Sequence, residues 1–194
     1  AVPGYQSWGT VAYGIRVSAN SYLYSMVSKL DLCDISDMAN KLHLHDGLGQ
    51  QLYDPGLLSA NIGGTRYGAT PLTMASAYAT FASEGKYCEP RPLEKITKSD
   101  GSPMKTYESK CEQAISPDIA NGVSYVLKGV LASGGSAPKR AIGLPDASAA
   151  KTGTNDNSSQ TWMVGYTRGL ATASWVGSND LGYRSMNGIA INGS

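Results

Sequence analysis

The sequence predicts an α+β fold in which an antiparallel sheet is flanked by helices. Apolar residues recur at helical spacing in several segments between positions 10 and 131. A strand of small residues at 149–154 is followed by alternating apolar runs at 161–166 and 171–176, which is typical of a three-stranded meander. Because the helices are interleaved with strands that are expected to pair antiparallel, the pattern indicates the α+β class.

The composition is that of a globular domain with little net charge. A length of 194 residues with 41% apolar residues is enough for one domain with a core, and it argues against disorder. Charged residues make up 16% of the chain and the net charge is +1, which gives no electrostatic case for binding nucleic acid or an acidic membrane. No apolar run approaches the roughly 20 residues of a membrane span, and no signal peptide is recognisable. We therefore expect any export signal or anchor to lie outside this sequence.

Three short helices are expected near the beginning of the chain. The first starts at Thr10, and positions 18–20 separate it from a second helix that Ser21 could cap. Asp34 could cap the third helix. The glycine-rich stretch 47–70 is then expected to be mostly loop.

Two longer helices carry a stronger start signal, a hydroxyl residue that can cap the helix followed by proline. Thr70 precedes the first of them and Ser116 precedes the second. Glycines are expected to close the two helices, at Gly85 and at Gly134-Gly135.

A hairpin is expected between the two longer helices, with strands at 93–96 and 104–107. Cys88 and Cys111 flank this hairpin. A disulfide between them would contribute roughly 3 kcal/mol in the chain-entropy model and would place the protein outside the cytoplasm. Spacing alone leaves the paired and the free states of these cysteines open. Cys33 is expected to be a buried free thiol.

The stretch Lys151-Thr152-Gly153-Thr154 ends the first strand of the meander. The lysine attracts an anion, the threonine hydroxyls can hydrogen-bond an anion or a peptide, and the glycine lets a ligand approach the backbone closely. These residues could line a binding site. In isolation the same residues also fit an ordinary edge strand that a lysine protects from further pairing.

The surroundings of this stretch resemble the transpeptidase domain of bifunctional (class A) penicillin-binding proteins. The segments that carry the resemblance are KTGTNDN at 151–157, WMVGYT at 162–167, WVG at 175–177 and TPLTMASAYATFA at 70–82. The resemblance covers most of residues 10–180 in the expected order. It implies a β-lactamase/transpeptidase-like fold, of which residues 1–194 would be the C-terminal part.

The family uses three elements, a Ser-x-x-Lys nucleophile, a Ser-x-Asn and a Lys-Thr-Gly. Residues 151–153 match the third. For the second, Ser18 and Asn20 are preferred over Ser59 and Asn61, because they lie between two helical patterns as the family's element does. The copy at Ser59 lies in a glycine-rich loop and is interpreted as a polar turn, and a polar helix junction is the plain alternative for Ser18 and Asn20.

The first element is not found in this sequence. Ser102 to Lys105 and Ser136 to Lys139 match the pattern, but both lie after Ser18 and both contain a proline where a helical turn is needed. We interpret both as loop coincidences. The nucleophilic serine is therefore expected on an N-terminal fragment of the same protein, and the family's closing helix is expected to be missing after Ser194.

The resemblance also implies the chemistry, which is acyl transfer from D-alanyl-D-alanine stem peptides of peptidoglycan, with β-lactams as inhibitors. Ser18 would relay a proton, Asn20 would hold the substrate amide, and Lys151 would set a positive potential. Thr152 and Thr154, with Gly153 between them, would bind the terminal carboxylate, and the Thr154 N–H would donate in the oxyanion hole. No cofactor is implied, and the expected location is the outer face of the bacterial cell membrane.

Two rival functions stay open. A serine β-lactamase shares the three elements, although the sequence shows no Glu-x-x-Leu-Asn setting and has Ser-Ala-Asn where Ser-Asp-Asn is usual in one class. A non-catalytic module that binds peptidoglycan is the second rival. His43, His45 and Asp46 are interpreted as a solvated helix end rather than a metal site, and two histidines alone give no credible Ser-His-Asp triad.

Overall fold

The computed structural model of the chain describes residues 9–138, 147–177, 185, 186 and 188. The expectations for Lys139 and for the chain after position 188 lie outside these residues.

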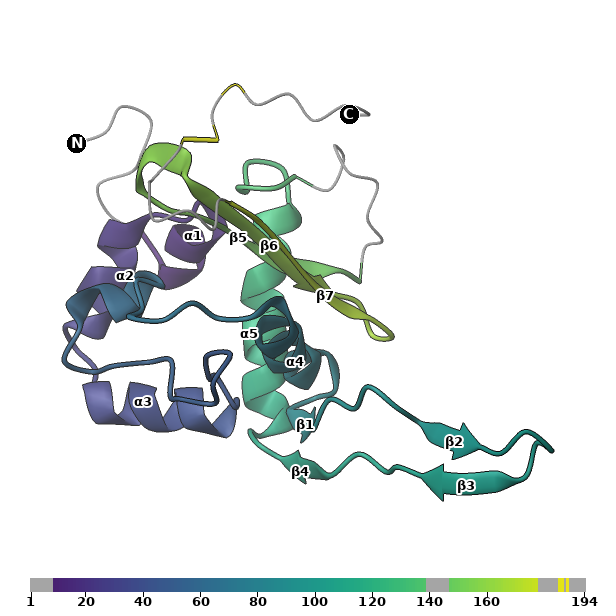
Figure 1. The fold of residues 1–194 in the computed structure, drawn as a ribbon. Helices are drawn as coiled ribbons and strands as arrows, with labels where there is room; N and C mark the ends of the chain where they lie inside the picture. The colour runs from purple at the N-terminus through teal and green to yellow at the C-terminus, as the bar shows by residue number, and fades with distance from the viewer. Residues whose placement is uncertain (1–8, 139–146, 178–184, 187, 189–194) are drawn as a thin grey trace.

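Figure 1 shows the helices and strands. The α-helices are α1 (Val11–Arg16), α2 (Asn20–Val27), α3 (Leu32–Lys41), α4 (Pro71–Ala82) and α5 (Pro117–Leu131), with 3-10 turns η1 (Leu58–Ile62) and η3 (Asp156–Ser158). The strands are β1 (Lys86–Cys88), β2 (Lys95–Thr97), β3 (Pro103–Thr106), β4 (Cys111–Gln113), β5 (Ala149–Thr154), β6 (Gln160–Tyr166) and β7 (Ala171–Gly177).

The predicted meander forms the three-stranded sheet of the described residues. Its strands run antiparallel in the order β5-β6-β7, with Lys151 opposite Val164 and Gly153 opposite Trp162. Helix α5 packs against β5, and α4 packs against β6 and β7 (Figure 1). The structure confirms the α+β class, and it places the Lys-Thr-Gly stretch on a strand at an edge of this sheet.

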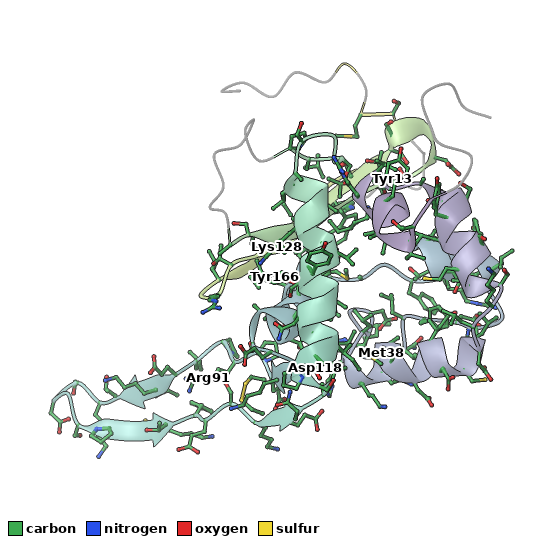
Figure 2. All side chains as sticks on the ribbon, turned by 180° about the vertical axis from the view of Figure 1, so that it is seen from behind. Tyr13, Met38, Arg91, Asp118, Lys128 and Tyr166 are labelled. Carbon is green, nitrogen blue, oxygen red and sulfur yellow. A yellow bond between two sulfur atoms is a disulfide. The ribbon has the colours of Figure 1, made fainter. Side chains whose placement is uncertain are left out.

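The core between the sheet and the two long helices is built around Tyr166 of β6. Its ring, labelled in Figure 2, packs with Leu127 of α5 and with Tyr78 and Phe81 of α4. The phenol oxygen is 2.7 Å from the hydroxyl oxygen of Ser124. Burial, with the Tyr166 phenol nearby, raises the pKa of Tyr78 to about 12. One buried residue therefore joins both helices to the same face of the sheet.

The two proline start signals are confirmed. The Thr70 hydroxyl accepts a hydrogen bond from the Thr73 N–H, and the Ser116 hydroxyl accepts one from the Ile119 N–H. Gly85 closes α4 with φ +89°, which is a backbone conformation that residues with a side chain rarely adopt, and its N–H donates to the Thr80 carbonyl.

Two predicted caps near the beginning of the chain are wrong. Helix α2 begins at Asn20 with Ala19 as its cap residue, so Ser21 lies inside the first turn. Helix α3 is capped by Asp31, whose carboxylate accepts from the Cys33 N–H at 2.8 Å. Asp34 lies in the first turn of α3, where a negative charge still interacts favourably with the helix dipole.

The expectation that Cys33 is buried is also wrong, since its side chain is exposed. Helix α3 packs through Ile35 and Ala39, four residues apart on one face, on a second apolar cluster that includes Tyr53. Cys33 precedes Ile35 by two positions, which places it on the opposite side of the helix.

The hairpin between α4 and α5 projects from the body of the molecule (Figure 1). We call the paired strands β1 and β4 the stem and the paired strands β2 and β3 the arm. In the stem, Cys88 lies opposite Cys111 and the two form a disulfide. In the arm every residue of β3 is exposed. Figure 2 shows Arg91 at the junction of the two, where its guanidinium donates to the Tyr107 carbonyl.

Within the described residues, no helix combines the length and the apolar character needed to cross a membrane.

Candidate active site

Ser18 lies in the turn that joins α1 to α2. Its backbone has φ +57°, a left-handed conformation, and its N–H donates to the Ile15 carbonyl. The turn is tight because α1 and α2 pack closely at Gly14, where a Cβ would lie 2.3 Å from Tyr22 Cβ. The close packing and the turn hold the exposed Ser18 hydroxyl at a fixed place beside the sheet.

Lys151 reaches this turn from strand β5. Its Nζ donates to Ser18 Oγ at 2.6 Å and to the carbonyl of Thr152 at 2.7 Å. An ammonium group has three donors, and two of them are used by acceptors among the described residues, so the third can serve a ligand. Burial lowers the pKa of Lys151 below its ordinary value, because the charged form is partly removed from water. The structure thus brings together Ser18 and Lys151, which sequence analysis placed in one site although they are 133 positions apart.

The other predicted site residues, Asn20, Gly153 and Thr154, lie at the beginning of α2 and the end of β5. Asn20 is the first residue of α2 and is exposed, and within the described part of the chain it makes no hydrogen bond to Lys151. Thr154 is the exposed last residue of β5. The Gly153 carbonyl accepts from the Thr161 hydroxyl at 3.1 Å, which ties this end of the strand to β6.

Thr152 has a neighbour that sequence analysis did not assign to the site. Ser136 Oγ lies 2.7 Å from Thr152 Oγ1. Ser136 is in the loop after α5, as expected, but this loop turns back onto β5. No local pattern around Ser136 points to Thr152, because the contact depends on how α5 packs against the sheet.

The rival matches to the family's elements lie elsewhere. Ser102 is in the turn of the arm, where its hydroxyl donates to Asp100 at 2.6 Å, and Lys105 lies on strand β3. Ser59 lies in the 3-10 turn η1, and its hydroxyl donates to the Gly64 carbonyl. Ser102 and Lys105 therefore do not share a helical turn.

The two histidines lie at the stem. His43 follows α3, stacks on the Tyr87 ring at 3.8 Å between centroids, and has Nε2 2.7 Å from a Glu112 oxygen. His45 Nδ1 is 2.8 Å from the Asp46 carbonyl. Both line a cavity of about 730 Å³ between the stem and α4. No group of three potential metal ligands occurs among the described residues.

Comparisons with known proteins agree with this architecture. Residues 2–181 match the family model of the penicillin binding protein transpeptidase domain. Penicillin-binding protein 1A of Mycolicibacterium smegmatis is 31% identical over 88% of this chain and 23% of its own length. Its counterpart in Mycobacterium tuberculosis is 30% identical over 95% of this chain and 24% of its own length. The chain thus spans about a quarter of the length of these curated relatives.

Solved structures share the fold. The PonA1 protein from Mycobacterium tuberculosis in complex with penicillin V is 26% identical, with a TM-score of 0.73 over 89% of this chain and 49% of that chain. Penicillin-Binding Protein 1A from Haemophilus influenzae has a TM-score of 0.76 at 18% identity, over 93% of this chain and 33% of that chain.

Proposed function

Because this chain belongs to the penicillin binding protein transpeptidase domain family, we propose that it forms two walls of a serine D,D-transpeptidase active site. The enzyme would cross-link peptidoglycan stem peptides and would be acylated by β-lactams. The observation that carries the proposal is the 2.6 Å hydrogen bond between Lys151 Nζ and Ser18 Oγ. It joins the Ser-x-Asn match on the α1–α2 turn to the Lys-Thr-Gly match on β5.

In the proposed reaction, a serine hydroxyl attacks the carbonyl carbon of the peptide bond between two D-alanines. The C–O bond forms, the C–N bond breaks, and the terminal D-alanine leaves with a proton on its amine. An amine from a second stem peptide then attacks the acyl carbonyl carbon, so that a C–N bond forms and the ester C–O bond breaks. One proton of this amine returns to the serine oxygen. Ser18 can pass the proton to the leaving amine, since a hydroxyl both accepts and donates.

The β5 residues would bind the end of the substrate that does not react. A terminal carboxylate, in the substrate or in a β-lactam, would accept hydrogen bonds from the hydroxyls of Thr152 and Thr154. The positive charge of Lys151 would strengthen these bonds, and more so because partial burial lowers the local dielectric. The Thr154 N–H would donate to the developing oxyanion, and loss of one such donor typically raises the barrier by about 3 kcal/mol.

We place the nucleophilic serine on a segment outside residues 1–194. Ser102 lies in a turn before strand β3, which carries Lys105, and Ser136 lies in a loop, so neither serine lies on a helix. On this proposal, residues 1–194 form the C-terminal part of the transpeptidase domain, on the outer face of the cell membrane. We call this chain together with the serine-bearing segment the reconstituted enzyme.

Acylation of the reconstituted enzyme by a fluorescent penicillin tests the proposal. We expect Ser18→Ala to slow acylation by on the order of 100-fold or more, because the proton relay is lost. Ser25→Ala removes a hydroxyl from the exposed side of the neighbouring helix α2 and is expected to leave the rate unchanged. An unchanged rate in Ser18→Ala would overturn the assignment of the relay.

The fate of the adduct separates the rival functions. A transpeptidase keeps the penicilloyl group for a long time, whereas fast release with turnover of penicillin would identify a β-lactamase. A reconstituted enzyme that takes no label but binds peptidoglycan would identify a non-catalytic module.

A further inference from the structure

The hydroxyl of Ser136 contacts the strand to which we assign the substrate carboxylate. Ser136 belongs neither to the Lys-Thr-Gly nor to the Ser-x-Asn element, yet its Oγ is 2.7 Å from Thr152 Oγ1. Its side chain is exposed, while Thr152 is half-buried. We propose that Ser136 is a positioning residue that orients the Thr152 hydroxyl toward the carboxylate, an inference that rests on the proposed function.

The protons of the two hydroxyls decide how the pair works. Each hydroxyl has one proton, and the bond between them uses one of the two. If Ser136 donates, the Thr152 proton is free for a ligand. If Thr152 donates, it presents only lone pairs, which repel an anion. A carboxylate beside Thr152 therefore selects the arrangement in which Ser136 donates to Thr152 and Thr152 donates to the carboxylate, and each bond polarises the next.

The backbone around Ser136 is held on two sides. The Ser136 N–H donates to the carbonyl of Arg16 at 3.0 Å, and the Ala137 N–H donates to that of Val130 at 3.1 Å. Arg16 is the last residue of α1, two positions before Ser18. Hydrogen bonds therefore connect the loop after α5 to the segment that carries Ser18 and also to Thr152. Ser136 thus contacts both walls of the proposed site.

Further contacts fix the course of this loop. The Arg16 guanidinium donates to the Ser133 carbonyl. Gly135 approaches the end of α5 so closely that a Cβ there would lie 2.1 Å from the Val130 oxygen. Because the backbone is determined by these contacts, the Ser136 hydroxyl is not needed to hold the loop in place, and its direction toward Thr152 calls for another role.

The test compares substrates with and without the carboxylate. In the reconstituted enzyme, Ser136→Ala is expected to slow acylation by a penicillin about 3- to 10-fold, the loss of one hydrogen bond. Acylation by the methyl ester of the same penicillin should not change, since the ester has no anion for Thr152 to bind. The carboxylate-to-ester rate ratio therefore falls, which a merely structural role of Ser136 would not produce.

Three further variants make the result decisive. Ser136→Thr keeps the hydroxyl and is expected to restore the ratio, whereas Ser136→Val has the same shape without the hydroxyl and is expected to lower it as Ser136→Ala does. Ser133→Ala removes a hydroxyl from the same loop and keeps the carbonyl that Arg16 binds, so it serves as the matched control. Thermal unfolding of each variant confirms that the fold is retained.

The outcomes for this inference and for the proposed function differ. If the unsubstituted reconstituted enzyme takes no label, the proposed function fails. If it takes the label and Ser136→Val has the same carboxylate-to-ester ratio as Ser136→Thr, the inference about Ser136 is overturned. An equal loss with both substrates also overturns it, because the serine would then act only through the fold.

Discussion

The proposed active-site walls and the stem join distant parts of the chain in different ways. Lys151, Ser18 and the Ser136–Thr152 pair connect through single hydrogen bonds between polar side chains that are exposed or half-buried. The stem connects through a disulfide, a strand ladder and the ring of His43 stacked on Tyr87. A ligand can compete for the first kind of contact but not for the second. On this basis we expect the hydrogen bonds of the proposed site to be exchanged when a ligand binds, and the contacts of the stem to stay unchanged.

The polar groups in the two regions also differ in how far they are exposed to solvent. Lys151 is partly buried, and burial lowers its pKa, so its interaction with an anion is only weakly screened. The His43–Glu112 contact joins side chains that are 39% and 62% exposed, and a polar contact this exposed to solvent contributes little to stability. We therefore expect substitutions at the site to change activity more than stability, and substitutions at the stem to do the reverse.

The largest expected effect is that of removing the Lys151 charge. In the reconstituted enzyme, Lys151→Met should slow acylation by penicillin by on the order of 100- to 1000-fold, as loss of a preorganised electrostatic group does. Lys128→Met is the matched control, because Lys128 is an exposed lysine on α5 (Figure 2). Equal rates in the two variants would contradict the role of Lys151.

The pH dependence follows from the same lysine. Since burial lowers its pKa, the folded chain loses this proton at a lower pH than the unfolded chain. Between the two pKa values the unfolded state binds more protons, so the Lys151 contribution to the free energy of unfolding rises with pH there. Acylation should fall over the same range as the charge disappears. Urea unfolding and acylation measured against pH, each compared with Lys151→Met, test these opposite trends. Parallel trends would contradict them.

Removing the disulfide should affect stability alone. The double substitution Cys88→Ser with Cys111→Ser is expected to lower the free energy of unfolding by roughly 3 kcal/mol, because the unfolded chain regains the freedom of the closed loop. Cys33→Ser, at the exposed free cysteine, should leave stability unchanged. Urea unfolding measures both. A loss of acylation per folded molecule in the double variant would show that the stem and the site are coupled.

Gly135 and Gly122, both in the α5 region, differ in the space around them, so substituting alanine at each should have opposite effects on stability. Gly135→Ala should destabilise the chain by about 1–3 kcal/mol, because a Cβ would overlap the Val130 carbonyl. Gly122→Ala, where nothing lies within 4 Å of the added Cβ, should stabilise α5 by about 0.5–1 kcal/mol. Thermal unfolding of the two variants gives the comparison, and destabilisation by both would contradict it.

The smallest effect is expected at the ring stack of the stem. His43→Ala should cost about 1 kcal/mol of stability through loss of the contact with Tyr87, and acylation should not change. Glu112→Gln keeps the stack and weakens only the exposed pair, so it should cost less. Denaturation midpoints of the two variants in the opposite order would show that the pair, and not the stack, holds α3 to the stem.

How far the sequence predicts the structure depends on the range of the interaction. The caps at Thr70 and Ser116 follow from adjacent residues, and the meander follows from local alternation. The cap of α2 could not be found in this way, because the turn at Ser18 depends on the packing of α1 against α2 at Gly14.

In the candidate site, too, some features could be predicted from the sequence and others could not. The family resemblance, and not any local pattern, brought Ser18 and Lys151 into one site. The contact of Ser136 with Thr152 depends on the path of the loop after α5. The exposure of Cys33 depends on which face of α3 packs on the apolar cluster around Tyr53. Propensity and spacing carry no information on such contacts.

Mapping the penicilloyl adduct of the reconstituted enzyme by peptide mass spectrometry tests the central claim most directly. We predict an adduct on a serine of the separate segment, with none on residues 1–194, and much slower formation of that adduct in Lys151→Met. An adduct on Ser102, on Ser136 or on any other residue of this chain would contradict the claim that these residues hold the substrate while another segment attacks it.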